Sequence, residues 1–247
     1  MKPSENICTI VPTYNNGGTL RDVVERVLKQ SANVIVVNDG CTDGSAEILA
    51  SFGDRITVVD YGRNRGKGYA LKQGFKKAKQ MGFDYVITID SDGQHYPEDM
   101  PLFLEAIAQH PGALIVGSRN LKQENMPGKS SFANKFSNFW FKIQTWIDLP
   151  DTQTGYRLYP LHRLPHIFSA RYEAELSLLV FSAWRGTPLV PIKINVYYPK
   201  AEDRVTHFRP FWDFFRISVL NTILCLVAVV YGWPSMLFHK LFGRRDA

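Results

Sequence analysis

Short apolar runs alternate with helical patterns through the first half of this 247-residue chain. Five of these runs have the length of buried strands. They lack the polar–apolar alternation of a strand that has one face exposed to solvent. They are residues 7–11, 34–37, 56–59, 85–89 and 113–116. The apolar residues between them recur at helical spacing, as at Leu20, Val23 and Val27. The alternation predicts an α/β fold with a mostly parallel sheet that is covered by helices on both faces.

Polar residues follow each predicted strand, at the edge where a parallel sheet binds its ligands. The carboxyl ends of parallel strands meet at one edge, and ligands bind in the crevice outside it. Each strand end contains glycine together with polar residues, which is also typical of ordinary turns. The five stretches are residues 12–18, 38–44, 64–68, 90–95 and 117–119. Their occurrence at one edge predicts a site for a polar ligand.

Two carboxylates after the fourth strand are candidate metal ligands. Asp90 and Asp92 are alternate residues, so their side chains point the same way in an extended segment. Converging carboxylates repel one another without a cation, and Mg²⁺ and Mn²⁺ prefer such hard oxygen ligands. Gln94 offers a further neutral oxygen. We expect Mg²⁺ or Mn²⁺ at Asp90, Asp92 and Gln94; the alternative is a turn that caps the next helix.

Two cations at the strand ends suit phosphate. Lys67 lies between two glycines, within reach of a diphosphate, although Gly68 stands where a Walker A loop requires Ser or Thr. Arg119 follows the fifth strand, and its planar guanidinium matches phosphate geometry. The alternative for both is a solvated surface charge.

Six stretches in a fixed order give the chain a resemblance to a known family. They are residues 11–15 (VPTYN), 37–40 (VNDG), 64–71 (NRGKGYAL), 90–94 (DSDGQ), 117–119 (GSR) and 151–157 (DTQTGYR). The ordered set resembles glycosyltransferase family 2, the inverting enzymes of GT-A fold, and its polyprenyl-phosphate branch, which is similar to dolichyl-phosphate mannosyltransferase. The resemblance implies a Rossmann-like, mostly parallel sheet.

The resemblance also implies roles for individual residues. Eight residues at the first four strand ends would bind the nucleotide sugar. They are Pro12, Thr13, Tyr14, Asp39, Asn64, Lys67, Asp90 and Ser91. Arg119 would bind the phosphate of the acceptor, and Asp151 would lie beside the reacting sugar. The catalytic residues implied are therefore Asp92, Arg119 and Asp151.

These residues predict an enzyme, a metal-dependent hexosyltransferase that moves one sugar from a UDP- or GDP-sugar to a polyprenyl phosphate. A phosphate monoester is largely ionised near pH 7, so this acceptor needs no strong base. A lipid or glycan hydroxyl, as in the assembly of envelope glycolipids or polysaccharides, would need one, for which Asp151 is the first candidate. A nucleotidyltransferase and an inactive module that binds nucleotide sugars remain as alternatives.

The C-terminal segment is apolar enough to associate with a membrane. Residues 217–238 carry no charge, and a membrane-spanning helix needs ~20 residues, but Gly232, Trp233 and Pro234 interrupt this run. A kinked single span, a re-entrant hairpin and an amphipathic helix in one leaflet all fit; a buried core helix is disfavoured because the run ends the chain. We expect a GT-A catalytic domain over residues 1–203 and an interfacial, membrane-associated helical segment over 204–247.

Charge and cysteine content constrain the partners and the compartment. The chain has 29 Lys and Arg against 23 Asp and Glu, a balance that suits phosphate-bearing substrates or an anionic membrane. It has no basic run or zinc-finger spacing, so we expect no nucleic-acid partner. Its three cysteines lie far apart and the N-terminal residues lack the apolar core of a signal peptide. We expect an enzyme at the cytoplasmic face of a membrane, with a nucleotide sugar and a lipid-linked acceptor as partners.

Overall fold

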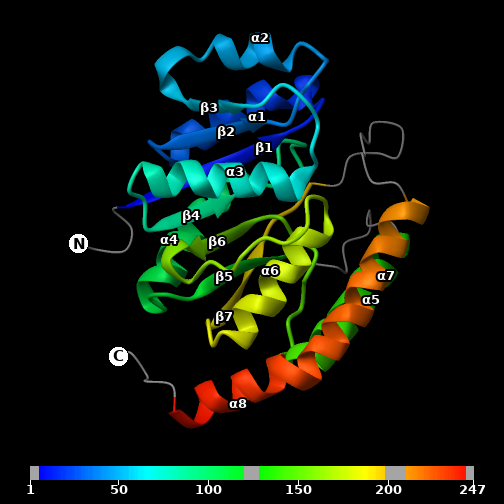
Figure 1. The fold of residues 1–247 in the computed structure, drawn as a ribbon. Coiled ribbons are helices and arrows are strands. Elements are labelled where there is room, and N and C mark those ends of the chain that lie inside the picture. Colours follow the sequence, from blue (N-terminus) through cyan, green and yellow to red (C-terminus); the bar gives the residue numbers. More distant parts are fainter. Residues whose placement is uncertain (1–5, 120–127, 198–209, 243–247) are drawn as a thin grey trace.

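A seven-stranded sheet forms the centre of the molecule (Figure 1), as the computed structural model describes it for residues 6–119, 128–197 and 210–242. The strands are β1 (Ile7–Thr13), β2 (Val34–Asn38), β3 (Thr57–Asp60), β4 (Tyr85–Thr88), β5 (Leu114–Arg119), β6 (Arg157–Pro160) and β7 (Leu189–Ile194). Their order in the sheet is β3-β2-β1-β4-β6-β5-β7. Only β6 runs antiparallel to its neighbours β4 and β5 among these described strands.

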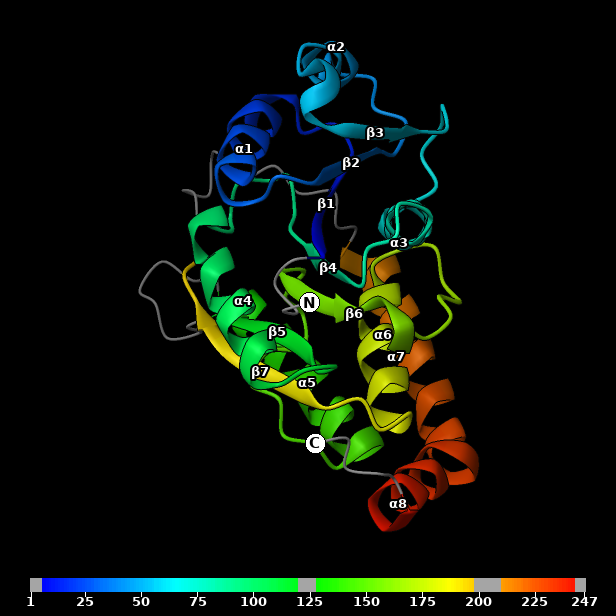
Figure 2. The same cartoon turned by 90° about the vertical axis from the view of Figure 1, so that its left-hand side faces the viewer.

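Helices cover both faces of this sheet (Figure 2). One face packs against α1 (Gly17–Gln30), α2 (Ser45–Ala50) and α4 (Met100–Gln109). The other face packs against α3 (Lys67–Gln80), α5 (Gly128–Thr145) and α6 (Glu173–Trp184). Three single 3₁₀ turns lie at Gly53–Arg55, Pro97–Asp99 and Leu161–Arg163. This layering confirms the α/β fold that the alternating apolar runs predict.

Two hydrophobic cores lie on opposite sides of the sheet because successive strand residues point to opposite faces. On β1, Cys8 and Ile10 enter the core under α3, whereas Ile7 and Val11 enter the core under α1. Both faces of the central strands are therefore apolar, which is why their sequences show no alternation. The edge strand β3 differs, since Val58 is 42% exposed there.

The last helices form one continuous run. We call residues 210–242 the C-terminal helical run: α7 (Pro210–Val227), a π-helical turn (Ala228–Gly232) and α8 (Trp233–Phe242). The helix therefore continues through Gly232–Pro234, where the sequence predicts an interruption, but α8 points in a different direction from α7 (Figures 1 and 2). Proline lacks an N–H and its ring crowds the carbonyl four residues earlier, and the wider π turn accommodates this without ending the helix.

The C-terminal helical run packs outside α5 and α6 (Figure 1). Its continuous helix does not fold back as a re-entrant hairpin would. Only 22% of its most apolar window is buried, so it is not a core helix either. The expected domain boundary at residues 203 and 204 lies outside the described residues.

Candidate active site

A polar cavity of about 560 Å³ opens at the carboxyl ends of β1, β2 and β4. This is the point where the strand order reverses, since β2 and β4 flank β1 on its two sides. The cavity is lined by Pro12, Thr13, Tyr14, Asn15, Asn16, Asp39, Asn64, Gly66, Lys67, Ala70, Asp90, Ser91, Asp92, Gln94, Arg171 and Tyr172. Ten of the residues predicted to bind nucleotide sugar or metal are among them; Arg119 and Asp151 are not.

Asp39 holds the loop that brings Asn64 and Lys67 into the cavity. Its carboxylate is 3% exposed and accepts hydrogen bonds from Tyr61 Oη (2.7 Å) and Asn64 Nδ2 (3.0 Å). The main-chain N–H groups of residues 65 and 66 donate to the same carboxylate, at 2.7 and 2.8 Å. Gly40, at φ +69°, lies so close to Arg63 that a Cβ atom there would clash with its backbone. Asp39 therefore positions this wall of the cavity.

Lys67 bridges two buried carboxylates on the cavity floor. Its Nζ lies 2.7 Å from Asp90 Oδ1 and 2.9 Å from Glu175 Oε2. Burial alone lowers the pKa of Lys67, but the two negative charges outweigh burial and raise it. Burial likewise works to raise the pKa of Asp90, and the charge of Lys67 overcomes this and lowers it. The pKa of Glu175 is raised, chiefly by its burial.

Asp92 is the acid beside this network that forms no ion pair with a cation in the described part of the chain. Burial, and then the charge of Asp90, raise its pKa to about 6. Its Oδ1 accepts a hydrogen bond from the main-chain N–H of Gln94 at 3.0 Å. Asn16 Nδ2 donates to Ser91 Oγ at 2.8 Å, which ties the loop after β1 to this segment.

The cavity suits a divalent cation that arrives with a phosphorylated substrate. No group of three or more His, Cys, Asp or Glu side chains forms a complete metal cage in the described part of the chain. Mg²⁺ commonly takes one or two carboxylates together with substrate phosphates. Asp90, Asp92 and Gln94 all line the cavity, and the raised pKa of Asp92 marks unneutralised negative charge there. This donor set therefore fits such a cation.

Arg119 and Asp151 form a buried ion pair beyond the cavity lining. Arg119 Nε and Nη2 donate to the Asp151 carboxylate at 2.6 and 3.0 Å, and Asn134 Nδ2 donates at 2.6 Å. The main-chain N–H groups of Arg119 and Gln153 also donate to it. Burial works to raise the pKa of Asp151, but the hydrogen bond and charge of Arg119 lower it. Such a carboxylate is a weak base, so this pair does not suit an acceptor that must lose a proton.

At the start of α6 the sequence offers two acids, Glu173 and Glu175, one of which could line the cavity, but it does not indicate Arg171 or Tyr172. Arg171 and Tyr172 line it, and Glu175 reaches Lys67 from the first turn of that helix. Of the two acids at this helix start, Glu175 is thus the one in the site, whereas Glu173 is not. His95 is buried against Tyr156 instead of lining the cavity, and burial lowers its pKa to about 4.

The family assignment follows from a comparison of this chain with known proteins. Residues 8–160 match the family model described as glycosyl transferase family 2. The chain belongs to glycosyl transferase family 2. The resemblance inferred from the ordered stretches is confirmed, and the chain is a glycosyltransferase. These matched residues contain β2 to β6, all of β1 except Ile7, and most of the cavity lining.

Individual relatives have names that specify lipid-linked acceptors. The undecaprenyl-phosphate mannosyltransferase of Micrococcus luteus is 31% identical over 207 residues, which cover 76% of this chain and 82% of that protein. The UDP-N-acetylglucosamine–dolichyl-phosphate N-acetylglucosaminyltransferase of Methanococcus voltae is 27% identical over 241 residues, covering 87% of this chain and 96% of that protein.

Solved structures confirm the GT-A fold. Glucosyl-3-phosphoglycerate synthase from Mycobacterium tuberculosis, crystallised with Mn²⁺, UDP-glucose and phosphoglyceric acid, matches with a TM-score of 0.63 and 17% identity. The match covers 90% of this chain and 79% of that chain. At this level of identity the likeness shows the fold alone.

Proposed function

We propose that this enzyme transfers one sugar, with inversion, from a nucleotide diphosphate sugar to a polyprenyl phosphate. The observation that carries the proposal is the cavity itself, where Lys67, Asp90 and Asp92 meet the loop after β1. Relatives over most of the chain are named for undecaprenyl or dolichyl phosphate, which supports the choice of acceptor. A transfer assay with different donors identifies the sugar and the base.

Mg²⁺ or Mn²⁺ held by Asp90, Asp92 and Gln94 would neutralise the leaving diphosphate as a Lewis acid. The chain's own residues supply the remaining tasks. Pro12, Thr13 and Tyr14 end β1 at the cavity wall, where the nucleotide would bind. The loop fixed by Asp39 presents Asn64 and Lys67 to the same volume. Tyr172, on the α6 side, would close the cavity around the donor.

The acidic groups of the site favour an acceptor that is already ionised. Asp39 is engaged in four hydrogen bonds, and Asp90 and Glu175 are both paired with Lys67. Asp151 is paired with Arg119 and has a lowered pKa. A phosphate monoester needs no base, so its oxygen would attack the anomeric carbon directly. Arg119, at the end of β5, would orient the acceptor phosphate.

Sugar transfer tests this proposal directly. Labelled UDP- and GDP-sugars would be offered to the full-length protein with polyprenyl phosphate and Mg²⁺ or Mn²⁺. We expect lipid-borne label that mild acid releases, because a sugar phosphate ester is acid-labile and a simple glycoside is not. EDTA and Asp92→Asn should each abolish transfer, whereas Asp148→Asn, an acid 76% exposed outside the cavity, should leave transfer unchanged.

Each other outcome points to a different enzyme. Acid-stable label on lipid or glycan would move the acceptor to a hydroxyl, and release of pyrophosphate would indicate a nucleotidyltransferase. Transfer that persists in EDTA and in the Asp92→Asn variant would contradict the metal assignment. We further propose that the enzyme acts at the cytoplasmic face of a membrane, to which its C-terminal helical run binds.

A further inference from the structure

The C-terminal helical run is apolar on two opposite sides. Its inner stripe, formed by Asn221, Leu224 and Ala228, is buried against the catalytic domain. Its outer stripe recurs every three to four residues and is exposed. The outer stripe consists of Phe215, Val219, Ile223, Leu226 and Val230. A helix in water would carry polar residues on that outer side. The exposed apolar residues therefore indicate that this side contacts a membrane or another protein.

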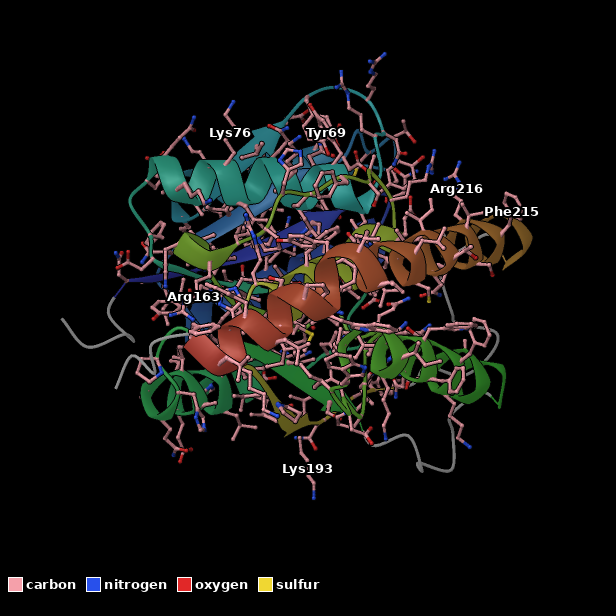
Figure 3. The ribbon with its side chains drawn as sticks, turned by 60° about the horizontal axis from the view of Figure 1, so that its bottom comes forward. Tyr69, Lys76, Arg163, Lys193, Phe215 and Arg216 are labelled. Carbon is pink, nitrogen blue, oxygen red and sulfur yellow. The ribbon has the colours of Figure 1, made fainter. Side chains whose placement is uncertain are left out.

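Specific contacts fix the inner stripe to α5 and α6. Gln144 Nε2 donates to Asn221 Oδ1 at 3.1 Å inside the helix interface, and Ser235 Oγ donates to the Trp184 carbonyl at 2.7 Å. Gly232 lies so close to the Trp184 ring that a Cβ atom would overlap it. Trp146, which directly follows α5, stacks on Trp233, with ring centroids 5.3 Å apart. These contacts hold the run along the domain through both α7 and α8 (Figure 3).

Further exposed apolar side chains lie on α5 and directly after it. Nineteen large hydrophobic side chains are exposed among the described residues; eleven lie on the run, Phe139 and Ile143 lie on α5, and Trp146 directly follows α5. On the run, Leu226, Val230 and Leu241 are 68%, 78% and 72% exposed. We call the outer stripe, the exposed apolar residues of α8 and the residues Phe139, Ile143 and Trp146 the apolar face.

We propose that the run lies in the plane of a membrane, docked on α5 and α6, with the apolar face inserted in one leaflet. The run is long enough to span a bilayer, with a mean hydropathy of 1.8. Spanning, however, would pull α7 away from Gln144 and α8 away from Trp184, and would break the contacts that bury the inner stripe. An in-plane helix keeps these contacts and still places the outer stripe in hydrocarbon.

A lipid leaflet is the occupant that these residues favour. Arg216 and Lys240 flank the uncharged segment at its two ends, as cations do where a helix meets anionic headgroups. The choice of lipid over a second copy of the chain rests on the proposed function, since a polyprenyl acceptor lies in the membrane. α7 runs alongside α6 in the same direction (Figures 1 and 2), and α6 begins beside the cavity residue Tyr172. The leaflet would thus extend from the active site along the molecule.

Probe depth separates the in-plane arrangement from a span. Val219→Cys, Leu226→Cys and Leu237→Cys would each carry a nitroxide, in a background with Cys41 and Cys225 replaced by Ser. The first and last positions lie ~27 Å apart along a helix axis. In vesicles of phosphatidylglycerol and phosphatidylethanolamine, we expect all three probes at one shallow depth. A depth that changes steadily from residue 219 to residue 237 would overturn the proposal.

Vesicle binding provides the second measurement, with matched variants. Leu226→Glu combined with Val230→Glu should weaken binding to the same vesicles at least about tenfold. Met81→Glu combined with Leu102→Glu alters side chains that are 43% and 41% exposed elsewhere, and should bind as the wild type does. Dimerisation without vesicle binding would also overturn the proposal, in favour of a second copy. Binding at equal depth without sugar transfer would contradict only the proposed function, since neither measurement requires a substrate.

Discussion

Loss of the positive charge of Lys67 should destabilise the site more than loss of any other charge there. It is the cation between Asp90 and Glu175, and the three side chains are only 10–24% exposed. Lys67→Met would leave both carboxylates buried without a partner, which costs about 3–5 kcal/mol of unfolding free energy. Urea denaturation measures this loss. Combining Lys67→Met with Glu175→Gln should restore part of it.

The matched control is Lys142→Met, because Lys142 pairs with Asp148 at the surface, where the two side chains are 59% and 76% exposed. Exposed pairs of this kind contribute ~0–1 kcal/mol. Equal losses in the Lys67 and Lys142 variants would contradict the assigned role of the buried network.

Asp92 should reduce stability at neutral pH in the absence of a divalent cation. Its pKa is about 6 in the folded protein and 3.8 as the reference value, so folding favours its protonated form. That contribution is complete below the lower pKa and is lost as the pH rises through about 6. At pH 7.5 the free energy of unfolding of the Asp92→Asn variant should therefore exceed that of the wild type by an amount on the order of 1–2 kcal/mol. The variant should also lose sugar transfer.

Denaturant titrations at two pH values measure the effect of Asp92→Asn. The gain should largely disappear near pH 4, where the folded wild-type carboxyl is protonated and the unfolded one is only partly ionised. Mg²⁺ or Mn²⁺ should stabilise the wild type and leave the variant unchanged. A gain of the same size at pH 4 and pH 7.5 would show that repulsion at Asp92 is not its cause.

Most cavity residues could be predicted because the chain places them directly after strands. Asp39, Asp90 and Asp92 follow apolar runs that are recognisable from local sequence, and one topological rule brings strand ends together. Arg171 and Tyr172 follow no strand, so nothing local indicates that they face the same cavity. The pairing of Arg119 with Asp151 also depends on tertiary structure, since the two residues are 32 positions apart.

At the scale of elements, strands and helices whose structure is decided by local sequence could be predicted. Those that depend on contacts with distant segments could not. β1 and β2 are continuous apolar runs and α1 has apolar residues at helical spacing, so local sequence decides their structure. β6 has four residues and begins with Arg157, which is fully buried and hydrogen-bonded to main-chain carbonyls. α5 buries the polar residues Asn134 and Gln144. Neither element shows a simple apolar pattern, because their buried polar residues make hydrogen bonds to distant segments.

The π turn in the C-terminal helical run gives a prediction at this scale. Gly232 lies against the Trp184 ring, so the methyl group of Gly232→Ala has no space unless α8 moves outward. Overpacking of this kind costs about 1–3 kcal/mol. Thermal unfolding in mild detergent measures the effect. Val230→Ala, two residues away and 78% exposed, is the control and should change stability little; equal shifts would argue against tight docking at Gly232.

At the scale of the whole molecule, the inner stripe of the C-terminal helical run belongs to the hydrophobic core of the catalytic domain. Leu224 and Ala228 are part of the same cluster as Trp184 and the sheet residues Ile10 and Val116. Trp184 Nε1 also donates to the Gln144 carbonyl at 2.8 Å, which ties α6 to α5 directly beneath the run. A helix that merely tethered the enzyme to a membrane would not complete its core.

Truncation tests whether the run is a tether or a structural element. Ending the chain at residue 203, the boundary expected from the sequence, would expose Trp184 to water. It would also remove Trp233, on which Trp146 stacks, and the partner of Gln144. We therefore expect the truncated protein to aggregate and its unfolding temperature to fall, as measured by light scattering and thermal unfolding. A chain that ends at Phe242, where α8 ends, keeps these contacts and should match the full-length protein. A soluble, monomeric 1–203 fragment with an unchanged unfolding temperature would show that the run is only an appendage. In that case the docked, in-plane arrangement would lose its main structural reason.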